Sequence, residues 1–195
     1  MNELPFLKMH GLGNDFVIID QRKLQINLNK ELICRIANRQ RGVGCDQVAI
    51  ILKNPQTDAE LVFFNSDGST STTCGNATRC IARHLMQDLH KSKLTLTTGN
   101  KILTAKDLGQ GLISVNMGNP EMEWNNIPIS EEIDTLKLPI EGSPTATGMG
   151  NPHCTFLWTM LTKSILRILG QNLKTTPFFQ KKQMCSLQVY WGQAI

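Results

Sequence analysis

One stretch constrains this chain more than any other: an apolar run, a glycine turn, and a cysteine where a helix is expected to begin. The run Leu61–Phe64 predicts a buried strand. Residues Ser66–Gly68 are typical of a turn, because a short polar residue and an aspartate precede a glycine that can adopt positive φ. After Asn76, apolar residues recur at helical spacing, so a helix is expected to start near Cys74.

A thiol at a helix N-terminus has a specific chemical meaning. Unpaired backbone N–H groups and the positive end of the helix dipole favour an anion there. We therefore expect a lowered pKa for Cys74, and the same N–H groups can hold a substrate carboxylate. Gly75 allows a ligand to approach the backbone closely, and Asn76 adds an amide donor and acceptor. The stretch predicts a thiol that acts as an acid or base beside an anion pocket.

Two other interpretations of this cysteine stay open. Free cysteines are among the most buried residue types, so Cys74 is also compatible with a small core residue in a turn. A metal site made by Cys74, Cys80 and His84 is less favoured, because no Cys-x-x-Cys or His-x-x-x-His pair accompanies them. Cys80 and His84 are one helical turn apart, where core packing is the usual outcome, so no metal site is predicted.

Composition limits the classes of partner. The 195 residues contain no apolar run long enough to cross a bilayer and no secretory signal pattern. The six cysteines have no tight spacing framework, which indicates reduced thiols and a cytoplasmic protein. The net charge of +4 is uneven: no acidic residue follows Gly142, whereas five basic residues do. The preceding segment therefore has 15 basic against 16 acidic residues. This near-neutral balance gives no reason to expect nucleic acid as a partner, and no membrane partner is predicted.

The rest of the chain predicts an α+β fold with a mixed or antiparallel sheet curled round a central helix. Asn29 is a typical helix N-cap, followed by an apolar stripe, and Gly42–Gly44 is expected to end that helix. Glycine-rich residues 11–15 are expected to form a loop, and Gly99-Asn100 is typical of a hairpin turn. Further strands are expected at residues 6–10, 16–20, 48–52, 94–98, 101–105 and 112–116.

Three segments are expected along the chain. Residues 1–117 form an N-terminal lobe, residues 118–156 begin a second, incomplete lobe, and residues 157–195 are an aberrant tail. The phrase Met117–Pro120 recurs at Met149–Pro152, just before His153. His153 suits a general base or an orienting group, although an isolated histidine is more often structural.

Four phrases of this sequence, taken together, resemble diaminopimelate epimerases. They are Lys8–Phe16, Gly42–Gln47, Asn65–Cys80 and Gly148–Cys154, in that order over the first four-fifths of the chain. Four ordered blocks are far more specific than any one of them alone.

The resemblance implies a cofactor-independent epimerase that acts on the α-carbon of LL-diaminopimelate, in lysine biosynthesis. It implies two lobes, each a sheet curled round a helix, with the amino-acid substrate between them, and a homodimer. One cysteine per lobe removes or donates the α-proton. By position, Cys74 is the first acid/base and His153 supports catalysis. The residues carried over as substrate-binding are Asn14, Gln47, Asn65, Gly75, Asn76 and Asn151.

The sequence departs from that family after Phe156. The family's second cysteine block is absent, and neither Cys154 nor Cys185 has its Cys-Gly-polar context. Codons allowed from the third base of Leu157 onward permit the family's expected phrases, and the last base of the Trp158 codon then begins an aspartate codon. We therefore expect a change of reading frame near Leu157; the alternative is a genuine divergent tail. With one catalytic cysteine, this chain is expected to be inactive as an epimerase.

Three other functions are weighed against this one. A proline-type epimerase and a phenazine-type isomerase share the two-lobe architecture, but the full Cys-Gly-Asn and Met-Gly-Asn-Pro-His set argues against them. The third alternative is a non-catalytic, one-lobe binding fragment.

Overall fold

The computed structural model describes residues 3–24, 26–127, 129–157 and 186–190, and it contains two compact units, Met1–Gly118 and Asn119–Ile195. Each unit is described by itself. The tail expected at residues 157–195 lies largely outside the described residues, because 158–185 and 191–195 are not among them.

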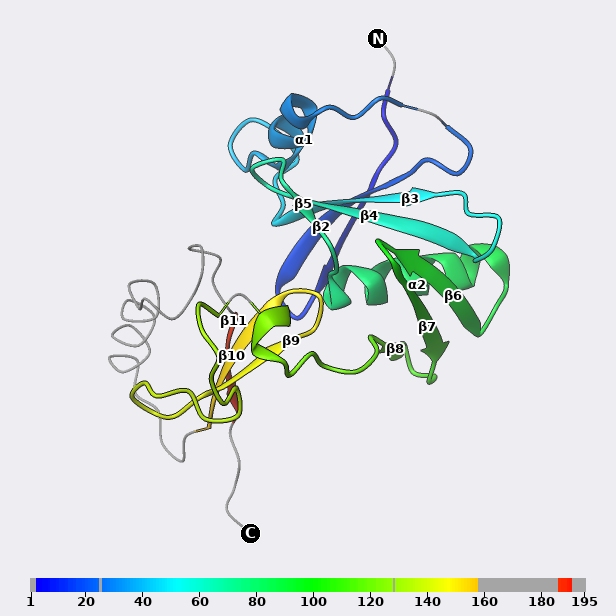
Figure 1. Ribbon diagram of the computed structural model, residues 1–195. Helices are drawn as coiled ribbons and strands as arrows, with labels where there is room; N and C mark the ends of the chain where they lie inside the picture. The colour runs from blue at the N-terminus through cyan, green and yellow to red at the C-terminus, as the bar shows by residue number, and fades with distance from the viewer. Residues whose placement is uncertain (1–2, 25, 128, 158–185, 191–195) are drawn as a thin grey trace. The chain divides into compact units, whose positions relative to one another are not determined.

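Unit 1 contains an eight-stranded mixed sheet and two helices (Figure 1). The strands follow the order β1-β2-β3-β4-β6-β7-β8, and β5 pairs with β4. The pairs β2–β3 and β4–β6 are parallel, whereas the other pairs are antiparallel. The elements are β1 (Leu7–Gly11), β2 (Asn14–Asp20), α1 (Lys30–Ala37), β3 (Gln47–Leu52), β4 (Ala59–Asn65), β5 (Thr70–Ser71), α2 (Gly75–Leu89), β6 (Lys93–Thr98), β7 (Lys101–Asp107) and β8 (Ile113–Asn116).

The sheet curls round α2, as expected. Both edge strands, β1 and β8, contact this helix, and so do β2, β6 and β7. The apolar stripe predicted on the helix is confirmed, because Ala77, Ile81, Ala82 and Leu85 have no exposed surface. These side chains form one core with the strand residues that face the helix, including Phe16, Leu61 and Phe63.

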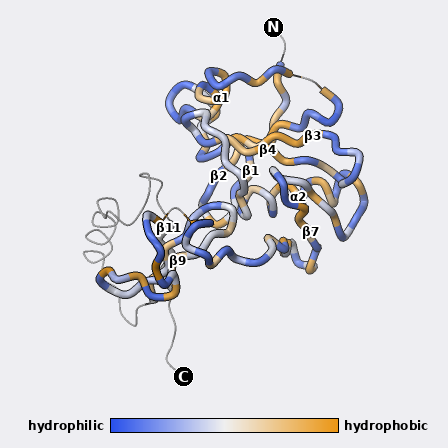
Figure 2. Tube along the Cα trace, in the orientation of Figure 1, coloured by the Kyte–Doolittle hydropathy of each residue, from blue (hydrophilic) through white to orange (hydrophobic). Residues whose placement is uncertain are grey.

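A second core lies on the opposite face of the sheet, under α1. Val17, Ile19 and Val48 pack there against Ile33 of α1, whereas Phe16 and Ile18 belong to the core around α2. Because successive strand residues point to opposite faces, β2 is buried on both and is apolar without alternation. Figure 2 shows the hydrophobic residues gathered on these central strands and hydrophilic residues on most connecting loops.

Several local expectations need correction. The first helix ends at Ala37, where Asn38 donates its backbone N–H to the Cys34 carbonyl, so Gly42–Gly44 lies beyond the helix end. The loop expected at residues 11–15 is only a two-residue turn, because β2 begins at Asn14. The run Leu61–Phe64 alternates between buried and half-buried residues instead of being buried throughout. The N-cap at Asn29 is confirmed, since its side chain accepts a hydrogen bond from the Leu32 N–H.

Unit 2 has a small core of its own. Strands β9 (Thr145–Gly148) and β10 (Pro152–Leu157) pair in antiparallel fashion, and β11 (Ser186–Tyr190) pairs with β10 in parallel. A short 3-10 helix, η1 (Trp124–Asn126), precedes them. The buried residues of this core are Ile127, Ile129, Leu138, Ala146, Cys154 and Phe156.

Candidate active site

Cys74 occupies the N-cap position of α2, as the sequence predicts. Its backbone is extended, with φ −148° and ψ 101°, and its carbonyl accepts the first helical hydrogen bond, from the Thr78 N–H at 2.9 Å. The Ala77 N–H donates to the Cys74 sulfur at 3.5 Å. A backbone donor thus points at the sulfur from the first turn of the helix.

The expected direction of the pKa change at Cys74 is wrong. Burial raises the pKa of the Cys74 thiol, because the thiolate loses hydration in this environment. The backbone N–H groups of Ala77 and Asn76 and the charge of Arg79 act in the opposite direction, but they do not outweigh the loss of hydration. The helix N-terminus therefore offsets only part of the free energy that burial adds to the thiolate. The resting form of Cys74 at neutral pH is the thiol.

A tight hairpin brings Asn14 to this thiol across 60 residues of sequence. Leu12 and Gly13 have φ values of 56° and 86°, as a type I′ turn requires. This turn pairs Gly11 with Asn14, and the Cys74 thiol lies 4.0 Å from the Asn14 Oδ1, to which it donates. Gly11 lies against the first turn of α2, since a Cβ there would be 3.4 Å from the Asn76 carbonyl oxygen.

Gln47 and Asn65 face each other at the end of the sheet where β2 begins with Asn14. Their Cα atoms are register partners across β3 and β4, and Gln47 is also the partner of Phe16 in β2. The Gln47 Nε2 donates to the Asn65 Oδ1 at 2.9 Å, and the Asn65 Nδ2 donates to the Ser69 Oγ at 3.0 Å. The Gln47 Oε1 is buried and has no hydrogen-bond partner among the described residues. A buried acceptor without a partner is a place where an N–H group of a ligand gains a hydrogen bond.

Gly75 and Asn76 form the first turn of α2. The Asn76 Oδ1 accepts a hydrogen bond from Arg79. A Cβ at Gly75 would have only ordinary contacts, at 3.9 Å from Arg79 and Met117. Packing therefore does not require a glycine at position 75, and the expected close approach of a ligand to Gly75 stays a prediction.

Asn151 and His153 belong to unit 2, where they form a separate pair. The His153 Nδ1 lies 2.9 Å from the Asn151 carbonyl oxygen, and His153 is half-buried in β10. Six predicted site residues thus lie in unit 1, where Cys74 contacts Asn14 and Gln47 contacts Asn65, and two lie in unit 2.

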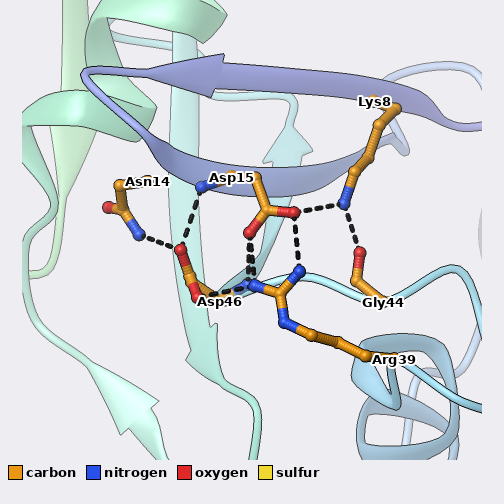
Figure 3. Close-up of polar contacts among 6 residues, drawn as sticks. All are labelled: Lys8, Asn14, Asp15, Arg39, Gly44 and Asp46. Atoms are coloured by element: carbon orange, nitrogen blue, oxygen red, sulfur yellow. Dashed lines mark hydrogen bonds and ion pairs between the residues drawn. The ribbon is translucent and has the colours of Figure 1, made fainter.

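A charged network that the sequence did not predict lies beside Asn14 (Figure 3). The Asp46 carboxylate accepts from the Asn14 Nδ2 at 2.8 Å and from Arg39 at 2.7 Å. Arg39 also pairs with Asp15, and so does Lys8, each at 2.7 Å. The local sequence contains one signal for this network: Asp46 stands beside glycines at the start of a strand.

Within the described residues, no group of three or more histidine, cysteine or acidic side chains is arranged to hold a metal ion. In unit 1, Cys34, Cys45, Cys74 and Cys80 are free thiols. Burial raises the pKa of Cys45 and of Cys80 as well. No helix in the described part of the chain is long and apolar enough to cross a membrane.

The fold is similar to those of a probable proline racemase and a phenazine biosynthesis protein. A probable proline racemase from Agrobacterium radiobacter superposes with a TM-score of 0.58 at 12% identity, over 90% of this chain and 61% of that one. A phenazine biosynthesis protein of the PhzF family from Bacillus anthracis gives a TM-score of 0.54 at 18% identity, over 80% of this chain and 56% of that one. These similarities define the architecture.

Sequence comparison defines the family. The model of the diaminopimelate epimerase family matches residues 6–123. Diaminopimelate epimerase from Acidiphilium cryptum is 42% identical over 183 residues, which cover 91% of this chain and 66% of that protein. The corresponding protein of Pelagibacter ubique is 40% identical and covers 92% and 69%. The chain therefore belongs to the diaminopimelate epimerase family, and it spans about two thirds of the length of these relatives.

The extent of these alignments bears on the tail. Residues 1–156 make up about 80% of the chain, whereas the two relatives align over 91% and 92% of it. Two other relatives, from Zymomonas mobilis and Phenylobacterium zucineum, align over 78% of it. The change of reading frame expected near Leu157 stays a prediction.

Proposed function

We propose that this chain provides the first-lobe half of a diaminopimelate epimerase site and exchanges the α-proton of LL-diaminopimelate without a cofactor. One observation carries the proposal. Cys74 begins α2 between a backbone N–H donor, from Ala77, and a side-chain acceptor, on Asn14. The first stabilises the thiolate and the second stabilises the thiol, so the sulfur can hold a proton or release it.

In this proposal Cys74 alone removes and returns the α-proton. As thiolate, its sulfur takes the hydrogen from the substrate α-carbon, and the electron pair of that C–H bond stays on the carbon. As thiol, it returns the proton and becomes thiolate again. Burial, which raises the pKa of Cys74, excludes water and strengthens the sulfur as a base once it is deprotonated.

The remaining site residues suit an amino acid. In this proposal the N–H groups of Gly75 and Asn76, at the start of α2, bind the substrate carboxylate. The unpartnered Gln47 Oε1 is an acceptor for a substrate ammonium group. Asn65 holds Gln47 in place through its hydrogen bond. In this proposal Asn14 also contacts substrate, and from unit 2 Asn151 binds substrate and His153 supports catalysis.

Inversion of the α-carbon requires a second acid/base on the opposite face. In this 195-residue sequence Cys154 is fully buried in the core of unit 2, and Cys185 lies outside the described residues. We therefore expect this polypeptide to exchange the α-proton with retention of configuration. Its proposed partners are a small amino-acid substrate and a second copy of the chain, and its proposed location is the cytoplasm.

Incubation of LL-diaminopimelate with the protein in deuterium oxide tests the proposal. The expected product carries α-deuterium and keeps the LL configuration, measured by proton NMR and by separation of the stereoisomers. Cys74→Ala should abolish the exchange, whereas Cys34→Ala, which removes another free thiol of unit 1, should leave it unchanged.

Each other outcome selects an alternative. Exchange of proline or hydroxyproline in place of diaminopimelate would indicate a proline-type epimerase. Isomerisation of a phenazine precursor would indicate the phenazine-type function. Binding of diaminopimelate without exchange would leave a one-lobe binding fragment. The coding DNA through codon 157 decides separately whether the frame changes.

A further inference from the structure

The Asp46 carboxylate lies beside the Asn14 side-chain amide. The Asp46 Oδ2 accepts hydrogen bonds from the Asn14 Nδ2 at 2.8 Å and from the Asp15 backbone N–H at 3.0 Å (Figure 3). A carboxylate has acceptors and no donor, so only the NH₂ end of the amide can face it. The oxygen of Asn14 is then the end that faces the Cys74 sulfur, at 4.0 Å.

We propose that Asp46 is a positioning residue that fixes the Asn14 amide and so presents an acceptor oxygen to the Cys74 thiol. This inference rests on the proposed acid/base function of Cys74. It assigns a role in the reaction to a residue that does not touch the sulfur.

The charged network holds Asp46 rigidly enough for this role. The second carboxylate oxygen of Asp46 accepts from Arg39 at 2.7 Å. The Asp46 backbone N–H donates to the carbonyl oxygen and to the Oδ1 of Asp15, each at 3.0 Å. Asp15 is held by Arg39 and by Lys8, and the hydrogen bond from Arg39 is the largest cause of its strongly lowered pKa. The start of β3 is thus clamped to the start of β2.

The orientation of Asn14 has a definite effect on the sulfur. An acceptor oxygen stabilises the S–H form, whereas the NH₂ end of the amide in the same place would stabilise the thiolate. The other charged or titratable groups that act on Cys74 are Arg79 and Cys80, both on α2. Asp46, by turning the Asn14 oxygen toward the sulfur, therefore adds to the preference for the thiol that burial already produces.

The variant Asp46→Asn tests the proposal. Asparagine keeps the shape of aspartate but has both a donor and an acceptor, so the Asn14 amide becomes free to turn. The readout is the rate of alkylation of Cys74 by iodoacetamide against pH, followed by mass spectrometry of the peptide that contains it. Near neutral pH we expect a rate increase of about three- to tenfold, the change that accompanies a midpoint lower by roughly half to one pH unit.

Two controls separate orientation from charge. Asp15→Asn removes one negative charge from the same network, and its amide oxygen can still accept from the Asp46 N–H. It therefore measures the effect of charge while the contact between Asp46 and Asn14 is kept. Asp88→Asn removes a carboxylate that is paired with Arg22 elsewhere in unit 1, and it should leave the midpoint unchanged. Asp46→Asn must lower the midpoint of Cys74 alkylation by more than Asp15→Asn does.

A double variant closes the test. In an Asn14→Leu background there is no amide to turn, so Asp46→Asn should then act no more strongly than Asp15→Asn. An undiminished effect in that background would overturn the proposal. If Asp46→Asn loses structure, Asn14→Ala decides instead, because loss of the oxygen should itself lower the midpoint. Alkylation needs no turnover, so an absence of deuterium exchange would reject the proposed function without changing this result.

Discussion

The packing of α2 can be tested at Ile81, the fully buried residue near the middle of the helix. Its side chain belongs to the core between the helix and the sheet. The position of Cys74 depends on this core, because the helix that begins at Cys74 is held by it. The change Ile81→Ala removes three carbon atoms from that core and leaves the helix propensity favourable.

The magnitude follows from burial. Three buried carbons at about 0.8 kcal/mol each give a loss of about 2.4 kcal/mol, and the cavity left behind raises the total into the range of about 2–5 kcal/mol. A matched control lies on β7: Ile102 is 65% exposed, so Ile102→Ala should change the free energy of unfolding by no more than about 0.5 kcal/mol. The smaller change Ile81→Val should cost about 0.5–1.5 kcal/mol.

Hydrogen exchange followed by mass spectrometry is the suitable assay. Unit 1 contains neither tryptophan nor tyrosine, so intrinsic fluorescence does not report its unfolding, whereas the amides of α2 do. The protection of peptides from α2 should fall in the order wild type, Ile81→Val, Ile81→Ala. Equal protection in Ile81→Ala and Ile102→Ala would refute the idea that this core holds the helix.

Two further predictions concern unit 1. Burial by itself would raise the pKa of Asp58, but hydrogen bonds from Lys91 and Thr95 outweigh burial and lower the pKa. Ionised Asp58 therefore stabilises the folded state when the pH is above 3.8, the ordinary pKa of aspartate, and this stabilisation is lost as the pH falls below that value. Asp58→Asn should cost about 1–3 kcal/mol at neutral pH and should flatten the acid limb of a circular-dichroism titration, so an equally steep limb would contradict the assignment. Leu12 is 92% exposed and has a positive φ, a backbone conformation that asparagine tolerates better than leucine. Leu12→Asn should therefore stabilise the protein by about 0.5–1 kcal/mol in thermal unfolding. A loss of stability would rule out strain at the turn.

The features predicted from sequence are those with local causes. The start of α2 at Cys74 and its buried stripe depend on residues within one helix, so spacing alone was enough to predict them. The same holds for the N-cap at Asn29, because the partner of a capping side chain lies three residues away. The early end of α1 was missed because Asn38, and not the more conspicuous Gly42–Gly44, ends the helix.

The features that sequence could not supply depend on distant residues. The direction of the pKa change at Cys74 is decided by burial, and a helix N-terminus considered alone gives the opposite sign. Asp46 meets Asn14 only because β2 and β3 are parallel neighbours. Nothing within either local segment indicates that pairing. Sequence therefore predicted the local start of α2 at Cys74, and the structure shows how the hydrogen bonds of the candidate site residues in unit 1 are directed.

The two ends of the hairpin formed by β3 and β4 differ in what they carry. Gln47 and Asn65 pair at its open end, and residues 53–58 connect the strands at the other, roughly 17–20 Å away for strands of this length. A reporter peptide or affinity tag inserted into that connection would leave the pairing of Gln47 with Asn65 intact. A single deletion inside either strand would instead turn one of the two amides to the opposite face of the sheet.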